Sequence, residues 1–139
     1  MFFFKKKQPT PHIQKSWRIT RNCLSLILES AKSTFPLEFA GLLRVSETER
    51  DMITEIMLLP GTIAGDAHAI FQMHMRPVDF FLVGTVHSHP SGSFYPSEAD
   101  KQLFRKYGKV HMIVAHPFDE NSLKAYDADG KEAIMQIVY

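Results

Sequence analysis

The sequence predicts one α/β domain, in which a curved mixed β-sheet of roughly six to eight strands packs with two main helices. Amphipathic helical patterns begin near Thr20 and near Ser97, and short runs of Val, Ile and Leu between turn residues separate them. The 139 residues, 45% of them hydrophobic, can bury one core but leave no room for a second domain. We therefore expect a flexible basic tail over residues 1–16 and a single domain over residues 17–139.

The first predicted helix runs from a cap at Thr20 to about Phe35, where Pro36 ends it. Its apolar stripe is Leu24, Ile27, Leu28 and Ala31. Strands over Leu42–Val45 and Ile53–Leu59 follow, and the charged stretch between them favours a hairpin.

The second half of the chain alternates apolar runs with turn residues. A second helix is predicted from Ser97 to about Tyr107. Asp129-Gly130 is a strong hairpin signal between the last two strands. The predicted strands here are Ala67–Met73, Phe80–Val86, Val110–Ala115, Ser122–Asp127 and Glu132–Val138.

Charge and cysteine content exclude several classes of protein. With a net charge of +1 and no basic stripe beyond the amino terminus, no nucleic-acid partner is expected. The single cysteine, Cys23, lies on an apolar helical face, which favours a core position and a reducing cytoplasm. The apolar run Phe2–Phe4 is too short for a transmembrane segment and precedes Lys5–Lys7, the reverse of the order in a secretory signal.

The most informative pattern is His87-Ser88-His89, followed after seven residues by Ser97 and after two more by Asp100. Two residues apart at the end of a buried strand, His87 and His89 would share a face, and both rings could meet one ion. Imidazole and carboxylate ligands suit zinc, and a catalytic site keeps a fourth position for water. The pattern therefore favours a zinc hydrolase in which three protein side chains bind the ion.

A purely structural explanation is open for part of this pattern. Ser97-x-x-Asp100 also resembles a capping box. A role in the cap and a role in the metal site can coexist, because a capping hydroxyl still has a proton to donate. The remaining histidines lack partners at comparable spacing, so we expect structural or surface roles for them. They include His68, His74, His111 and His116.

A hydrolase also needs a proton acceptor. Glu38 lies in Pro36-Leu37-Glu38-Phe39-Ala40-Gly41, at the start of an apolar segment, and it is the best candidate for a general base.

Together these residues resemble the JAMM, or MPN+, zinc metalloprotease family, whose pattern is an upstream Glu followed by H-[ST]-H-x7-S-x2-D. The match covers Glu38, His87, Ser88, His89 together with Ser97 and Asp100, and the resemblance extends over about residues 17–139. It is greatest to compact single-domain archaeal members. It implies a cytidine-deaminase-like MPN fold, one zinc ion held by His87, His89 and Asp100, Glu38 as general base and Ser97 as oxyanion donor.

By the same resemblance, the substrate would be a ubiquitin-like modifier conjugated to lysine, cut after its C-terminal Gly-Gly. Residues around Ile63–Met75 are candidates for a strand edge that holds the tail. Two alternatives stay open: a peptidase that trims an adduct from a sulfur-carrier protein, and a scaffold that binds ubiquitin-like proteins without cutting them. The pattern also leaves a homodimer open.

Overall fold

The computed structural model describes residues 13–59, 67–74 and 79–139. These residues form seven strands and three helices, and the strands close into a barrel in the order β1-β3-β2-β4-β5-β6-β7. No helix in this part of the chain is long and apolar enough to cross a membrane. The elements are β1 (Ser16–Thr20), α1 (Arg21–Thr34), β2 (Ala40–Val45), β3 (Met52–Leu58), α2 (Ala67–His74), β4 (Leu82–His89), α3 (Glu98–Lys106), β5 (Val110–Ala115), β6 (Leu123–Asp127) and β7 (Glu132–Val138).

The first helix has the predicted boundaries. The Thr20 side chain caps α1 by accepting a hydrogen bond from the Cys23 backbone N–H at 3.3 Å. Cys23 is buried with the predicted stripe, and burial raises the pKa of its thiol to about 12. The cysteine is therefore a core residue, as its position on the apolar face predicts.

The strands around β4 form the framework of the site. β2 and β3 pair as the expected antiparallel hairpin, β4 pairs antiparallel with β2, and β4 pairs parallel with β5. A Cβ atom on Gly84 would overlap the Val110 carbonyl, so a glycine is required where β4 approaches β5 this closely. The Asp129-Gly130 turn joins β6 and β7 as predicted.

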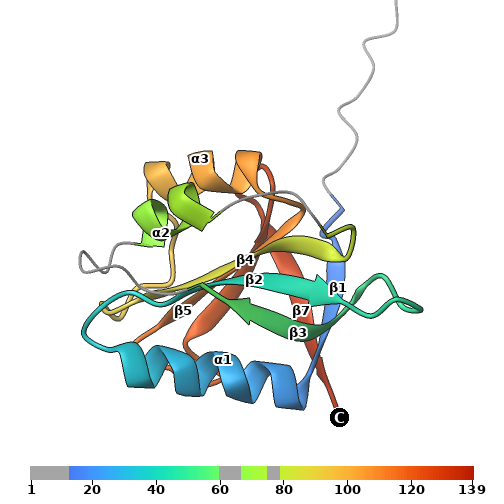
Figure 1. The fold of residues 1–139 in the computed structure, drawn as a ribbon, viewed down its shortest axis with the longest axis horizontal. Coiled ribbons are helices and arrows are strands. Elements are labelled where there is room, and N and C mark those ends of the chain that lie inside the picture. The colour runs from blue at the N-terminus through green and yellow to red at the C-terminus, as the bar shows by residue number, and fades with distance from the viewer. Residues whose placement is uncertain (1–12, 60–66, 75–78) are drawn as a thin grey trace, which may run out of the picture.

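The helices cover opposite sides of the barrel. α1 lies along one side, and α2 and α3 lie next to each other on the other (Figure 1). Two apolar clusters match this division: one joins α1 to residues such as Leu43 and Met112, and the other joins α2 and α3 to residues such as Leu42 and Ile113. The alternation of neighbouring residues between the clusters is the period-2 pattern of strands.

One expectation about the fold is wrong, and the structure adds two details to the others. The expected mixed sheet closes into a barrel, and a short third helix accompanies the two main helices α1 and α3. The segment predicted as a strand over Ala67–Met73 is helix α2. It buries Ala67, Ile70 and Phe71, whose i, i+3, i+4 spacing is helical. The likeness to cytidine deaminases stays a prediction.

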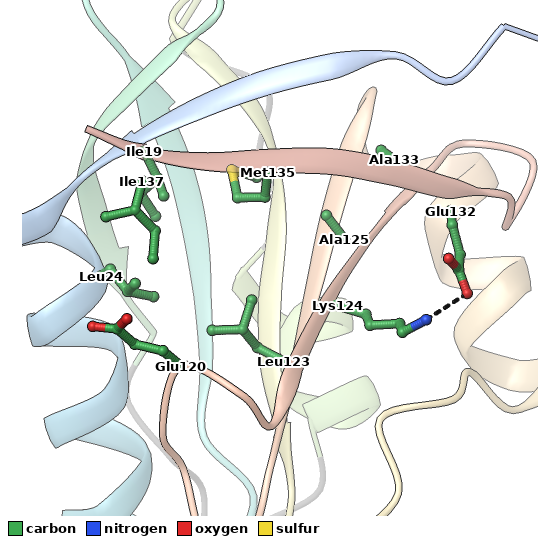
Figure 2. Close-up of a pocket in the computed structure, with 10 residues that line it drawn as sticks. All are labelled: Ile19, Leu24, Glu120, Leu123, Lys124, Ala125, Glu132, Ala133, Met135 and Ile137. Atoms are coloured by element: carbon green, nitrogen blue, oxygen red, sulfur yellow. Dashed lines mark hydrogen bonds and ion pairs between the residues drawn. The ribbon is translucent and has the colours of Figure 1, made fainter.

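β6 and β7 pair over a short stretch, only at Ala125↔Ala133 and Tyr126↔Glu132. Beyond these pairs the strands diverge around a cavity of about 260 Å³ on the side of α1 (Figure 2). An ion pair between Lys124 and Glu132 spans its rim. The lining is Ile19, Leu24, Glu120, Leu123, Lys124, Ala125, Glu132, Ala133, Met135 and Ile137, and it contains none of the predicted site residues.

Candidate metal centre

β4 places three polar side chains in a row on the side of α2 and α3. Thr85, His87 and His89 alternate along the strand, and their exposure increases from the buried Thr85 to the partly exposed His89. Thr85 Oγ1 lies 2.7 Å from Nδ1 of His111, a buried residue of β5. The two histidines of the motif therefore extend from a rigid, buried base to the surface.

α3 brings Asp100 to the same place through its N-terminal cap. Ser97 Oγ accepts a hydrogen bond from the Asp100 N–H at 3.0 Å, and Asp100 Oδ2 accepts one from the Ser97 N–H at 2.9 Å. This is the capping box that the spacing predicts. The box fixes the Asp100 carboxylate, which is 2% exposed, while Ser97 stays exposed.

The three predicted ligands converge. Nε2 of His87 lies 3.2 Å from Nε2 of His89 and 3.2 Å from Asp100 Oδ1, and His89 Nε2 lies 3.1 Å from Asp100 Oδ2. Ligand atoms bound to one tetrahedral zinc ion at ordinary bond lengths are separated by about 3.3 Å. The spacing of these atoms therefore suits a shared ion.

Hydrogen bonds and packing orient the rings for that role. His89 Nδ1 lies 2.9 Å from the Ser93 carbonyl oxygen, so Nδ1 carries a proton, and the neutral ring has its lone pair for a metal on Nε2. His87 Nδ1 is buried and has no hydrogen-bond partner among the described residues. Packing against Phe71, at 6.4 Å between ring centroids, orients the His87 ring instead.

The electrostatics of the cluster favour a charged carboxylate. Burial alone would raise the pKa of Asp100, but hydrogen bonds from His87 and His89 outweigh it and hold that pKa well below its usual range. For His89, burial lowers the pKa, whereas the hydrogen bonds to Asp100 and to the Ser93 carbonyl raise it, with a net increase. A metal ion would take the place of these protons, since it needs the carboxylate ionised and the imidazoles neutral.

Glu38 reaches the site from the segment between α1 and β2. Ala40 of β2 pairs with His87 of β4, which places Glu38 beside the end of the histidine strand. The half-buried Glu38 carboxylate accepts a hydrogen bond through Oε2 from the Ala67 N–H at 2.9 Å. Ala67 is the first residue of α2, and the N-terminus of a helix is a favourable place for a negative charge.

Two residues contact the site in ways that sequence reasoning did not predict. Ser88 points away from the ligands, and its Oγ accepts a hydrogen bond from the Phe39 N–H at 2.7 Å while its own N–H donates to the Phe39 carbonyl. It thereby holds the backbone next to Glu38. His68, for which we expected only a structural or surface role, has its Nε2 at 2.8 Å from Asp100 Oδ1. Its spacing from the motif carries no signal for this contact.

Comparisons with known proteins agree with this geometry. The family model for prokaryotic homologs of the JAB domain matches residues 20–129. A relative from Haloferax volcanii, described as a probable metalloprotease, is 35% identical over 120 residues, which cover 81% of this chain and 74% of the relative.

Two solved structures share both the fold and much of the sequence. A JAB1/MPN domain protein from Archaeoglobus fulgidus is 41% identical, with a TM-score of 0.69, over 88% of this chain and 98% of its own. A structure described as JAMM, a metalloprotease-like zinc site in the proteasome and signalosome, is 40% identical, with a TM-score of 0.68, over 90% of this chain and all of its own (100%).

The donor set of two imidazoles and one carboxylate is that of a catalytic zinc site with one position left for water. The converging atoms of His87, His89 and Asp100 fit this set, and the cofactor is zinc. The chain belongs to the JAMM/MPN+ family, within the group of prokaryotic JAB-domain proteins.

Proposed function

We propose that the protein is a zinc-dependent isopeptidase, which hydrolyses the amide bond between the C-terminal Gly-Gly of a ubiquitin-like modifier and a lysine side chain. The observation that carries the proposal is the convergence of His87, His89 and Asp100 on a site flanked by Glu38 and Ser97. Membership of the JAMM/MPN+ family supports the class of substrate.

His87, His89 and Asp100 would hold the ion. When bound, zinc at such a site lowers the pKa of a water molecule to about 7 and polarises the scissile carbonyl.

Glu38 would act as the general base and then as the general acid. It takes the proton of the attacking water and returns it to the departing lysine amine, so no covalent intermediate with the protein forms. The hydrogen bond from the Ala67 N–H fixes one carboxylate oxygen, and the second oxygen can accept the proton.

Ser97 would stabilise the oxyanion that develops on the scissile carbonyl. Its Oγ uses a lone pair to accept the Asp100 N–H, so the hydroxyl proton is not required for the cap. A donor fixed in this way needs little reorganisation when charge develops. Because Ser97 is exposed, a substrate could reach it.

A groove close to Glu38 supports a protein substrate. The groove, of about 640 Å³, lies between α1 and the end of β3, and it is lined by Leu26, Glu29, Ser30, Ser33, Thr34, Phe39, Leu58 and Leu59. Leu26 and Leu58 are 47% and 50% exposed, and Phe39 directly follows Glu38. An apolar surface next to the base suits the folded body of a modifier whose tail enters the site.

The strand edge predicted around Ile63–Met75 is absent from the part of that segment that the structure describes. Within the candidate segment around Ile63–Met75, the described residues Ala67–His74 form helix α2 and have no strand edge to offer. The remaining residues of that segment lie outside the described part of the chain.

The test is incubation of zinc-loaded protein with a ubiquitin-like modifier linked to lysine, with release followed by mass spectrometry. We expect cleavage directly after Gly-Gly, loss of cleavage on chelation and recovery with zinc. Replacing the penultimate glycine with leucine should abolish release, because the bulkier residue would not fit a narrow cleft. Equal cleavage of unfolded proteins, or of the leucine conjugate, would refute the substrate assignment. Cleavage of a sulfur-carrier adduct alone would favour the trimming peptidase.

A further inference from the structure

We propose that His68 is a positioning residue for the metal site, which holds the Asp100 carboxylate in the orientation that zinc requires. This inference rests on the metal-binding part of the proposed function and not on the identity of the substrate.

Both oxygens of the Asp100 carboxylate are held by neighbouring groups. His68 Nε2, on α2, lies 2.8 Å from Oδ1, and the Ser97 N–H, at the start of α3, donates to Oδ2 at 2.9 Å. The Asp100 side chain is 3% exposed and that of His68 is 30% exposed. Two separate elements therefore fix the carboxylate, and α2 provides one of the two contacts.

The contact lets His68 act on the metal site through Asp100, one of the three predicted ligands. The ligand atoms of His87, His89 and Asp100 form the converging group, whereas His68 meets that group through the Asp100 carboxylate. An ionised carboxylate has about four lone-pair sites, so it can accept the His68 N–H and still bind a metal. Such a hydrogen bond fixes the ligand before the ion arrives, which lowers the cost of ordering it.

α2 is well suited to carry a positioning residue. Ala67, Ile70 and Phe71 are all fully buried (0% exposed), which anchors the helix against the barrel and α3. The adjacent Ala67 N–H binds the Glu38 carboxylate. One turn of α2 therefore contacts both the proposed base and a metal ligand, and rigid elements place such groups more accurately than loops do.

The test compares zinc affinities by competition with a chromophoric chelator, without any substrate. His68→Ala removes the hydrogen bond, whereas His68→Gln keeps an N–H donor at the position of Nε2. His116→Ala is the matched control, because it removes an exposed imidazole whose ring packs against Phe35 and Phe118, outside the metal centre. We expect His68→Ala to bind one zinc ion about 10- to 100-fold more weakly than wild type. The His68→Gln and His116→Ala variants should stay within a few-fold of wild type.

Cobalt substitution separates positioning from direct ligation. If His68 acts through Asp100, cobalt-loaded His68→Ala keeps the visible absorption bands of the wild-type site, because the same atoms bind the ion. A change in those bands would show that His68 is itself a ligand and would overturn the inference. Wild-type zinc affinity in His68→Ala, or equally weak affinity in a folded His68→Gln, would also overturn it.

These outcomes do not depend on catalysis. A wild-type protein that binds zinc but cleaves no isopeptide conjugate would refute the proposed function and leave the role of His68 intact. Conversely, an active enzyme whose His68→Ala variant binds zinc normally would refute only the role of His68.

Discussion

At the scale of single residues, a change at Glu38 would separate metal binding from the proposed chemistry. Glu38 lies beside the converging atoms of His87, His89 and Asp100 and is not part of that group. We expect Glu38→Gln to lower kcat by a hundredfold or more, since an amide cannot accept the proton of water. Zinc content and melting temperature should stay close to those of wild type. Cleavage near the wild-type rate by this variant would show that Glu38 is not the base.

Different measurements can separate the cap formed by Ser97 from its proposed role as oxyanion donor. Ser97→Ala should lower kcat roughly a hundredfold if the hydroxyl is an oxyanion donor. It should also lower the free energy of unfolding by about 1 kcal/mol, because α3 loses its cap. Ser91→Ala, at an exposed position in the same loop, serves as the control for both measurements. A variant that is destabilised but fully active would have lost only the cap.

His111 makes stability depend on pH. Burial lowers the pKa of this fully buried side chain from 6.5 to about 4, against a smaller raising effect of the hydrogen bond to the Gly108 carbonyl. Between pH 6.5 and pH 4 the unfolded chain therefore binds a proton at His111 that the folded protein does not bind. The contribution of neutral His111 to the free energy of unfolding is full above pH 6.5 and is lost as the pH falls to 4. The loss is about 3 kcal/mol in total.

The measurement is denaturant unfolding of metal-free protein across this pH range, for wild type and for His111→Gln. The variant is less stable at pH 7, because it loses the stacking of His111 on Phe104, at 4.5 Å between centroids. The difference in the free energy of unfolding between wild type and His111→Gln should decrease as the pH falls. Parallel loss of stability in both proteins would exclude His111 as the cause.

The motif residues of the site could be predicted from the sequence, but their supporting contacts could not. Strand periodicity puts His87 and His89 on one face, and the resemblance to the JAMM family adds Asp100 at the nearby start of a helix. The contacts of Ser88 with Phe39 and of His68 with Asp100 join residues 49 and 32 positions apart. Such contacts depend on how strands and helices pack, and no local pattern encodes them.

At the scale of elements, the placement of β4 against β5 depends on Gly84. We expect Gly84→Ala to destabilise the protein by about 3 kcal/mol or more, because the new methyl group would displace the Val110 backbone from its partner strand. Gly92→Ala is the matched control, since a Cβ there meets nothing nearer than the His116 carbonyl oxygen at 4.0 Å. Thermal melting of both variants checks the difference, and equal melting temperatures would contradict it.

Most elements can be predicted from turn residues and caps. Two elements, α2 and β1, cannot be predicted in this way, and each has a physical reason. α2 is a short apolar segment, and a run of that length fits a strand as well as a helix. β1 alternates exposed and buried residues, with Trp17 and Ile19 inward, but it has only five residues and leads directly into the capped α1. In both cases the partners that decide the conformation come from distant parts of the chain.

At the scale of the whole molecule, closure of the barrel is the feature that is hardest to predict from the sequence. It depends on the parallel pairing of β1 with β7, from Ser16↔Ile134 to Thr20↔Val138, which joins the two ends of the domain. Neither the fully buried pattern of β5 nor the alternating pattern of β7 distinguishes a barrel from an open sheet. Only the accumulated twist and register of all seven strands decide between the two.

The closed barrel also predicts how the protein responds to loss of metal. Neither apolar cluster contains His87, His89 or Asp100, and hydrogen bonds from Ser97 and His68 stabilise the Asp100 carboxylate without an ion. We therefore expect the metal-free protein to stay folded at 25 °C. Zinc at a thousandfold excess over its Kd should add about 4 kcal/mol, which raises Tm by roughly 10 °C.

Calorimetry with chelator and with zinc measures this shift, and His89→Ala is the control in which it should vanish, because the variant loses a ligand. Since the ligands of the ion come only from β4 and α3, its stabilisation should add to that of the barrel and not replace it. Cooperative unfolding on chelation alone would show instead that the fold depends on the metal. Such a result would place this chain with domains in which the free energy of metal binding is the free energy of folding.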